Sequence, residues 1–504
     1  MSDPIEDKAL ILWLKNNYKE IEFIKHLPDY QRVDRLERIS KNIEKLKTTQ
    51  QLYSQKDLLI EIWKDLVAMA VIYLKSKDKR EKFHDDGDYG IDDLGNFFQK
   101  YCDFEKILYG SGEYYRDHVS HVFKVFILGE KFVNENLDYG FSSIELNDSK
   151  LMQTNLIQSD GETDTKFLQR QQEKLITANE KEAMWCIASL THDLGYPTEV
   201  VNDIHDNLRD MLTIFNIKDV SYILSQQSQK FNDSIIKLIS SDLILESKPE
   251  DEPQYITHTQ AKYYFKYSRS IEKWDHGVES CIVLVKSLVY FLETDYSIDE
   301  RKLLDIDDAR QFLIRQGILR AIASHNCDFI YHLKLDFSFL LRIIDEMQEW
   351  GRPSLKDLFT KTPDFGFSID KFTQKEIEYT ITFSNNTENP DAVNKNELHH
   401  DIKEYFKRCV NKYIKILRSA VFGNVRDGKL VLTVNIVDET ESDIKYKFVH
   451  INPTDIKMSL VSNELSYNNP TPIKLMEVNE SIELVQLDER NWTDFCKTLK
   501  NEEK

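Results

Sequence analysis

Helical periodicity dominates the chain from about residue 91 to residue 355. One segment, AMWCIASL at 183–190, is apolar on nearly every side, which is typical of a buried helix. Residues 1 to about 75 also follow a helical pattern, and the charged stretch at 75–90 indicates a loop. We therefore predict a mainly α protein, with an N-terminal helical region over 1–90 and a larger helical domain over 91–364.

The pattern changes after about residue 365. The segment EIEYTITFS at 376–384 alternates with a period of two, and a helical pattern follows near 396–420. The segments KLVLTVNIVD at 429–438 and IKYKFVHIN at 444–452 alternate again and could pair as a hairpin. These segments predict a small α+β domain over 365–504, with the order β-α-β-β and no catalytic motif. An exposed sheet edge would favour self-association into a homo-oligomer.

Charge and composition limit the classes of partner. The chain has 66 Lys and Arg against 86 Asp and Glu, a net charge of −20, which disfavours attraction to a phosphate backbone. Duplex DNA is therefore an unfavourable partner, whereas a divalent metal is compatible. The sequence contains no uncharged apolar stretch long enough to predict a membrane span. Its N-terminus is acidic before a short apolar run, whereas a signal peptide begins with a basic segment. Six cysteines without a CxxC pair indicate reduced thiols and a cytoplasmic location.

The stretch LTHDLGYP at 190–197 places two ionisable groups where the apolar helix ends. Gly195 can take the positive φ that closes a helix, and Pro197 would prevent the helix from resuming. A buried carboxylate beside a buried imidazole is unfavourable unless both are paired or bound to a cation. A single such dipeptide is more simply a helix cap, and a second one, His84-Asp85, lies in a charged loop with no apolar helix before it.

Four further apolar helical segments carry a residue type that binds metals. Taken singly, each histidine is more often an ordinary core or surface residue. Five such segments together favour metal binding over five separate structural roles. The four are RDHVSHVFKVFILG with His118, WDHGVESCIVLVKSL with His276, GILRAIASHN with His325, and FLLRIIDEMQEWGRP with Asp345.

The order of these residues, H…HD…H…H…D over about residues 100–355, resembles the HD-domain superfamily of metal-dependent phosphohydrolases. The resemblance implies an all-helical core on which the ligands converge, and two divalent ions, which could be iron, manganese, or zinc with magnesium. His121 is an alternative first ligand, but His118 fits the family phrase H-x-x-x-V because Val122 follows it. The implied ligands are His118, His192, Asp193 and Asp345 for one metal, and His276 and His325 for a second, with Asp193 bridging.

The resemblance implies hydrolysis of a phosphate ester in a small substrate, a nucleotide or a signalling nucleotide, with Asp193 central to catalysis. Many members place a lysine where this chain has Tyr196, whose hydroxyl can donate a hydrogen bond but is a weak acid near pH 7. Arg116, Lys124 and Arg352 are candidates for binding phosphate, with surface salt bridges equally compatible. Two alternatives stay open: a di-iron oxygenase with the same ligands, and an inactive scaffold whose C-terminal domain carries the function.

Overall fold

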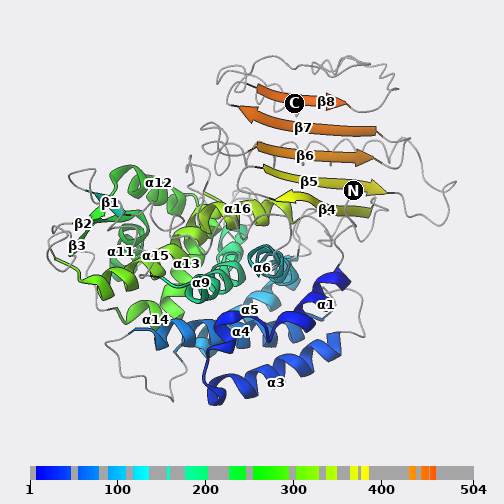
Figure 1. Cartoon of the computed structure of the whole chain (residues 1–504). Helices are drawn as coiled ribbons and strands as arrows, with labels where there is room; N and C mark the ends of the chain where they lie inside the picture. The colour runs from blue at the N-terminus through cyan, green and yellow to red at the C-terminus, as the bar shows by residue number, and fades with distance from the viewer. Residues whose placement is uncertain are drawn as a thin grey trace, which may run out of the picture.

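The described part of the chain is mainly α-helical, with two small β-sheets (Figure 1). This composition confirms the predicted fold class at the level of secondary structure. The computed structural model describes residues 7–46, 55–78, 89–108, 117–134, 156–158, 176–201, 226–245, 254–294, 302–327, 337–348, 364–372, 376–384, 431–438, 444–452 and 455–460.

Five helices form the N-terminal part. The fourth of them is apolar along most of its length and is buried accordingly, because it packs against the third helix and against the helix that precedes LTHDLGYP. Within this contact the Trp63 indole donates a hydrogen bond of 2.7 Å to the carbonyl of Leu190. The N-terminal region therefore contributes to the wall behind the histidines. The five helices are α1 (Asp7–Asn17), α2 (Glu22–Lys25), α3 (Asp29–Leu46), α4 (Lys56–Ser76) and α5 (Ile91–Leu108).

Five helices surround the candidate site. The most central is buried on almost every side, as its apolar sequence predicts, and it begins with a capping box between Thr177 and Glu180. It packs against α4 and against three of its four companions in this group, α6, α15 and α16. Burial of Trp185, which is fully enclosed, alone contributes about 2–3 kcal/mol. The five are α6 (Val119–Asn134), α9 (Ala178–Thr191), α13 (His276–Ser287), α15 (Ile306–His325) and α16 (Phe337–Met347).

A three-stranded sheet interrupts the helical region, so the prediction of helix throughout 91–355 was wrong there. The apolar run SDLIL is too short for its periodicity to separate a strand from a helix turn. The strand order is β1-β2-β3, with β1 and β2 parallel and β2 and β3 antiparallel. The elements are β1 (Leu156–Gln158), β2 (Ser241–Leu245), β3 (Tyr255–Thr259), and the neighbouring helices α11 (Gln226–Ser240), α12 (Ala261–Glu272) and α14 (Val289–Leu292).

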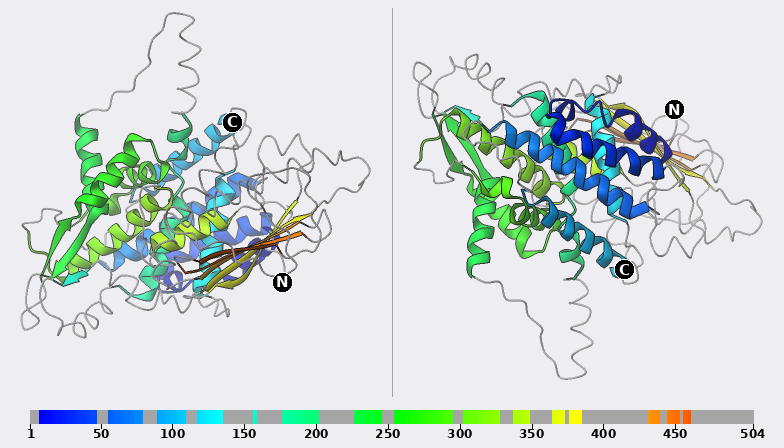
Figure 2. Two further views of the ribbon diagram at one scale, coloured as in Figure 1. Left: turned by 90° about the horizontal axis from the view of Figure 1, so that it is seen from above. Right: turned by 90° about the horizontal axis from the view of Figure 1, so that it is seen from below.

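A five-stranded sheet follows α16, at the opposite end of the helical body from the small sheet (Figures 1 and 2). Its first strand begins at Asp364. The hairpin predicted from residues 429–452 is confirmed, since Val434 pairs with Phe448 in an antiparallel ladder. The strands are β4 (Asp364–Phe372), β5 (Glu376–Ser384), β6 (Val431–Asp438), β7 (Ile444–Asn452) and β8 (Asp455–Leu460), in that spatial order.

The first and last strands of this sheet were not predicted. In β4 the glycine and the polar residues of DFGFSIDKF weaken the alternation, and DIKMSL in β8 is short. Strands β5 and β6 are parallel, which requires a long crossover connection. That connection, with the helix predicted near 396–420, lies outside the described residues.

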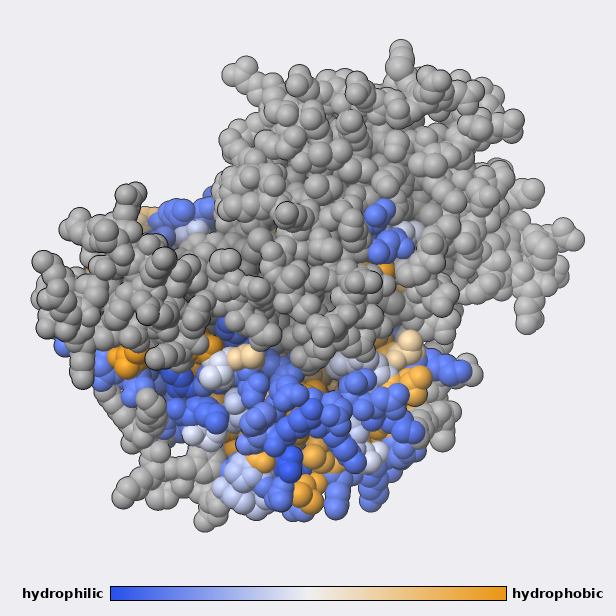
Figure 3. Space-filling model, in the orientation of Figure 1, coloured by the Kyte–Doolittle hydropathy of each residue, from blue (hydrophilic) through white to orange (hydrophobic). Residues whose placement is uncertain are grey.

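Within the described part of the chain, the structure contains no helix with the length and apolar character needed to cross a membrane. On the face shown in Figure 3, the surface of the N-terminal helices is mostly hydrophilic, with scattered hydrophobic residues. Exposed examples from these helices are Leu12, Tyr30 and Val33.

Candidate metal centre

The stretch LTHDLGYP forms the tight connection between two helices. Helix α9 ends at Thr191, residues 192–195 form turns, and a new helical segment begins at 196. Pro197 therefore lies in the first turn of the next helix, where its missing N–H is tolerated. The prediction that Pro197 would prevent the helix from resuming was wrong.

Gly195 does not adopt the positive φ predicted from the sequence. Among the described glycines, a positive φ occurs at Gly90 and not at Gly195. Its role is close packing. A Cβ at Gly195 would lie 2.6 Å from both the Glu279 Cβ and the Ser280 backbone N, in the first turns of α13. The Gly195 N–H also donates to the Ser280 hydroxyl at 2.7 Å. The absence of a side chain therefore lets the His-Asp turn lie directly on α13.

Four imidazoles and two carboxylates converge at this contact. They come from separate elements: His121 from the first turn of α6, His192 and Asp193 from the turn after α9, His276 from the start of α13, His325 from the end of α15, and Asp345 from α16.

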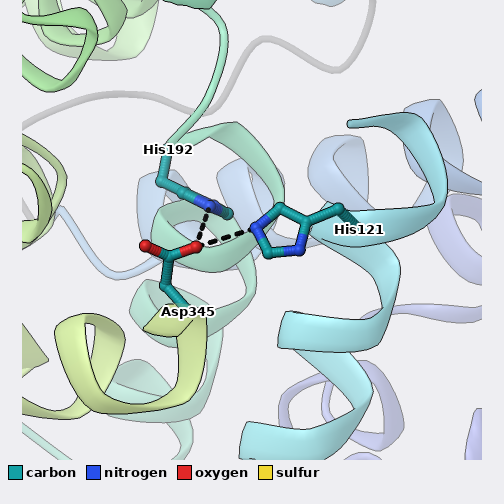
Figure 4. A group of neighbouring side chains, drawn as sticks. All are labelled: His121, His192 and Asp345. Carbon is teal, nitrogen blue, oxygen red and sulfur yellow. Dashed lines mark hydrogen bonds and ion pairs between the residues drawn. The ribbon is translucent and has the colours of Figure 1, made fainter. Parts of the chain in front are cut away.

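One half of the group lies around Asp345. The Asp345 Oδ1 is 2.8 Å from the His121 Nε2 and 3.6 Å from the His192 Nε2. Figure 4 shows both imidazoles directed at this carboxylate from α6 and from the end of α9. The ligand atoms of these three side chains lie within 4.8 Å of one another, close enough to hold one metal ion.

Asp193 lies between the two halves of the group. Its Oδ2 is 3.4 Å from the His192 Nε2 and 3.6 Å from the His121 Nε2. Its Oδ1 is 3.3 Å from the His276 Nε2 and 3.6 Å from the His325 Nε2. Each oxygen of this carboxylate therefore faces a different pair of histidines, which is the placement that a bridging ligand requires.

The Nδ1 atom of each imidazole, on the side of the ring away from the two carboxylates, lies within hydrogen-bond distance of an accepting oxygen. Because an accepting oxygen must receive the Nδ1 proton, each neutral ring keeps its lone pair on Nε2, toward the carboxylates. Anchoring of this kind is usual for metal-binding histidines. The acceptors are the Gln348 Oε1 for His121, the Ser189 carbonyl for His192 at 2.8 Å, a Glu199 oxygen for His276 at 2.6 Å, and the Ile322 carbonyl for His325 at 2.6 Å.

This orientation is unfavourable without a positive charge. The His192 Nε2 is buried without a hydrogen bond, although two carboxylates lie near it. The Nε2 atoms of His276 and His325 face each other at 3.0 Å, so two lone pairs meet unless a proton or a cation lies between them. The donor set of imidazole nitrogens and carboxylate oxygens fits divalent transition metals. These buried histidines and aspartates could therefore hold metal ions, and His192, Asp193 and His325 make a second group of suitable geometry.

The electrostatics of the group point the same way. Burial opposes ionisation of Asp193 and Asp345, but the neighbouring histidines hold the pKa of both carboxyls well below the usual range. Burial also lowers the pKa of His276, yet hydrogen bonds to Asp193 and Glu199 outweigh it and raise the pKa to about 10. The pKa of His192 is raised as well, whereas burial lowers the pKa of His325. A divalent cation would take the place of the protons that His192 and His276 hold.

The structure places His118 outside this group. It precedes α6, its backbone N–H donates to Glu105 at 2.7 Å, and its Nδ1 is 3.4 Å from the same carboxylate. His121, retained above as the alternative, is the histidine whose Nε2 reaches Asp345. The preference for His118 is therefore not supported by the geometry. A match to H-x-x-x-V does not determine which of two histidines near the start of a helix is directed at the site.

A buried ion cluster lies behind His118. The Lys56 ammonium pairs with Glu105 and, at 2.9 Å, with Asp117, and both carboxylates are fully buried. Burial would raise the pKa of Glu105, but His118 and Lys56 lower it overall. The cluster thus stabilises an ionised carboxylate that fixes the start of α6.

Of the remaining predicted residues, Tyr196 lies beside the centre. It is half-buried, with its ring tilted by 31° against that of His118 at a centroid distance of 3.9 Å and edge-on to His276 at 5.4 Å. Lys124 is fully buried and its Nζ pairs with Asp7 of α1 at 2.9 Å, which favours a structural role over phosphate binding. Arg116 and Arg352 lie outside the described residues.

Sequence reasoning missed the residues that support the ligands. Gln348 had a weak signal, because it follows Asp345 by three positions and so lies near it on a helix surface. Glu199 had none, because its partner His276 lies 77 positions away in sequence. Arg342 donates to the His325 carbonyl and so fastens α16 to the end of α15, a tertiary contact that no spacing reveals.

In comparisons with known proteins, no protein-family model matches the chain, and neither a curated protein nor a solved structure matches it.

Proposed function

We propose that the chain is a metal-dependent phosphohydrolase of the HD-domain type, acting on a phosphate ester of a nucleotide or signalling nucleotide. The observation that carries this proposal is the convergence of four anchored imidazoles on two carboxylates, with Asp193 directed at both halves. The order of these residues along the chain, with His121 in place of His118, remains the order of that superfamily.

The two halves of the group suggest two metal positions. His121, His192 and Asp345, with one oxygen of Asp193, would hold the first ion. His276 and His325, with the other oxygen of Asp193, would hold the second. The residues at these two positions would hold divalent ions, which would supply an acidified water as nucleophile near neutral pH and positive charge for the phosphoryl oxygens.

Substrate would approach from the side where α13 and α16 carry the less enclosed ligands. The His325 side chain is fully enclosed, whereas His276 and Asp345 retain 14% and 19% of their side-chain exposure. Tyr196 is half-buried beside His276, and we propose that its hydroxyl would donate a hydrogen bond to a substrate oxygen. We retain Arg116 and Arg352 as candidates for binding the phosphate. The net charge of −20 favours a small phosphorylated substrate over duplex DNA.

The direct test combines metal analysis of the purified full-length protein with a screen of nucleotides and other phosphate esters. We expect about two divalent ions per chain and release of phosphate or of a nucleoside phosphate. Asp193→Ala should lose both, whereas His258→Ala, at an exposed position on β3, should lose neither. Oxygen uptake by a di-iron form without phosphoester cleavage would favour the oxygenase alternative. A metal-free chain without turnover would favour the inactive scaffold.

We also propose a cytoplasmic location. The thiols of Cys186 and Cys281 are buried and not part of disulfides, a state that a reducing compartment preserves.

A further inference from the structure

Glu199 makes an unusual double contact with the first residue of α13. One of its carboxylate oxygens accepts the His276 Nδ1–H at 2.6 Å and the His276 backbone N–H at 3.0 Å. The backbone N–H of a first helical residue has no partner within its own helix. The N-cap residue Asp275 makes no side-chain cap hydrogen bond, so Glu199 performs this task from a distant part of the chain.

The position of Glu199 follows from the close packing at Gly195. The helical segment that begins at residue 196 starts where the His-Asp turn lies against α13, and Glu199 is on the first turn of that segment. The Ser280 hydroxyl joins the two sides, because it accepts from the Gly195 N–H and lies 2.8 Å from the His276 carbonyl. The same packing therefore sets both the His276 ring and the carboxylate that holds it.

A second group competes for the same ring nitrogen. The side-chain amide nitrogen of Asn326, just after α15, lies 2.7 Å from the His276 Nδ1. An amide N–H can only donate, and it would require the Nδ1 lone pair, leaving the ring proton on Nε2. A carboxylate can only accept, and it holds the proton on Nδ1. An Nε2 that carries a proton cannot bind a metal, so the two neighbours favour opposite states of the ligand.

We propose that Glu199 is a positioning residue for the second metal position: it holds the His276 proton on Nδ1 and so keeps Nε2 available for the ion shared with His325 and Asp193. The inference rests on the proposed metal centre. It concerns only the second position, because the anchors of His121 and His192 are Gln348 and the Ser189 carbonyl.

The test is a titration of metal-free, full-length protein with Mn²⁺, in which the electron paramagnetic resonance signal of free Mn²⁺ reports the affinity of each step. Glu199→Ala should weaken the second step about 10–100-fold, the usual effect of losing such a support, and leave the first unchanged. Glu199→Gln should retain much of the second step, because its amide oxygen still accepts from Nδ1. Adding Asn326→Ala to Glu199→Ala should restore part of the affinity by removing the competing donor.

A matched control is Glu279→Gln, which changes a mostly buried carboxyl one turn further along α13 and should leave both steps unchanged. If Glu199 served folding alone, Glu199→Ala would lower the melting temperature without weakening the second Mn²⁺-binding step more than the first, and this result would overturn the inference. Two unchanged steps in a folded Glu199→Ala protein would overturn the inference and leave the metal centre intact. If Glu199→Ala does not fold, Glu199→Leu is titrated in its place, because its side chain is of similar size and cannot accept a hydrogen bond from Nδ1. A second step as tight as that of the wild type in this variant would again overturn the inference. A wild-type chain that binds no Mn²⁺ would overturn the proposed centre together with this inference.

Discussion

Replacing Gly195 with alanine should push the His-Asp turn away from α13. The new Cβ would lie 2.6 Å from the Glu279 Cβ and from the Ser280 backbone N. These neighbours are a Cβ and a backbone atom, so neither can rotate away. The two segments must therefore separate by about 1 Å to reach an ordinary van der Waals distance.

Overpacking of this kind costs about 1–3 kcal/mol of folding free energy, or a melting temperature lower by a few degrees. The larger effect concerns the second metal position. His276 and Asp193 lie on opposite sides of the contact, and metal–ligand distances are held to about 0.2 Å, so a shift of this size removes the ion.

The assay compares melting temperature with and without Mn²⁺, together with metal content. Gly195→Ala should retain the first ion and lose most of the stabilisation that the second provides. Gly95→Ala in α5 is the matched control. The three atoms nearest to its new Cβ belong to the flexible side chain of Lys64, on the neighbouring helix α4, and alanine there should stabilise α5 by about 0.8–1 kcal/mol. A Gly195→Ala protein with two ions and a wild-type melting temperature would refute the reasoning.

Three further predictions concern neighbouring residues. His121→Ala should lose the first ion whereas His118→Ala should keep it, as measured by metal content, and the reverse result would restore His118 as the ligand. Asp193→Ala should lower turnover of any cleaved phosphoester by at least about 1,000-fold, or roughly 4 kcal/mol, while the metal-free protein melts near the wild-type temperature. Substantial activity in a folded variant would remove Asp193 from catalysis. Lys56→Met should destabilise the fold by about 3–5 kcal/mol at pH 7, because it leaves two buried carboxylates without their cation. Since the folded pKa of Glu105 is depressed, the wild-type ion pair contributes stability above the unfolded pKa and loses it as the pH falls. The difference between the two proteins in denaturant unfolding should therefore shrink toward pH 4, and an equal loss at both pH values would contradict this account.

The residues whose predictions agree with the geometry are those with strong local signals. AMWCIASL predicted a buried helix because no face of it is polar, and His192 and Asp193 followed as the groups at its end. The hairpin of β6 and β7 was predictable because the alternation there is strict. In each case the information lies within a few residues of the feature.

The choices that the geometry does not support depended on contacts across the fold. His118 and His121 are three positions apart, and only the placement of α16 determines which one meets Asp345. Lys124 has the charge to bind phosphate, but α1 supplies Asp7 to it. Gly195 is a glycine because of α13, which begins about eighty residues later, and not because of its own φ.

The distribution of the ligands along the chain also sets an order of events during synthesis. Asp345 lies 224 positions beyond His121, and Gln348, which anchors that histidine, comes after it. Contacts of such long range form late, because the intervening chain must be ordered first. A nascent chain therefore presents isolated histidines until α16 has been made and has docked. Under the proposed function, a cation that requires Asp345 would be acquired only by a chain whose helical core is already assembled. Metal content per molecule would then measure the fraction of chains that have completed folding.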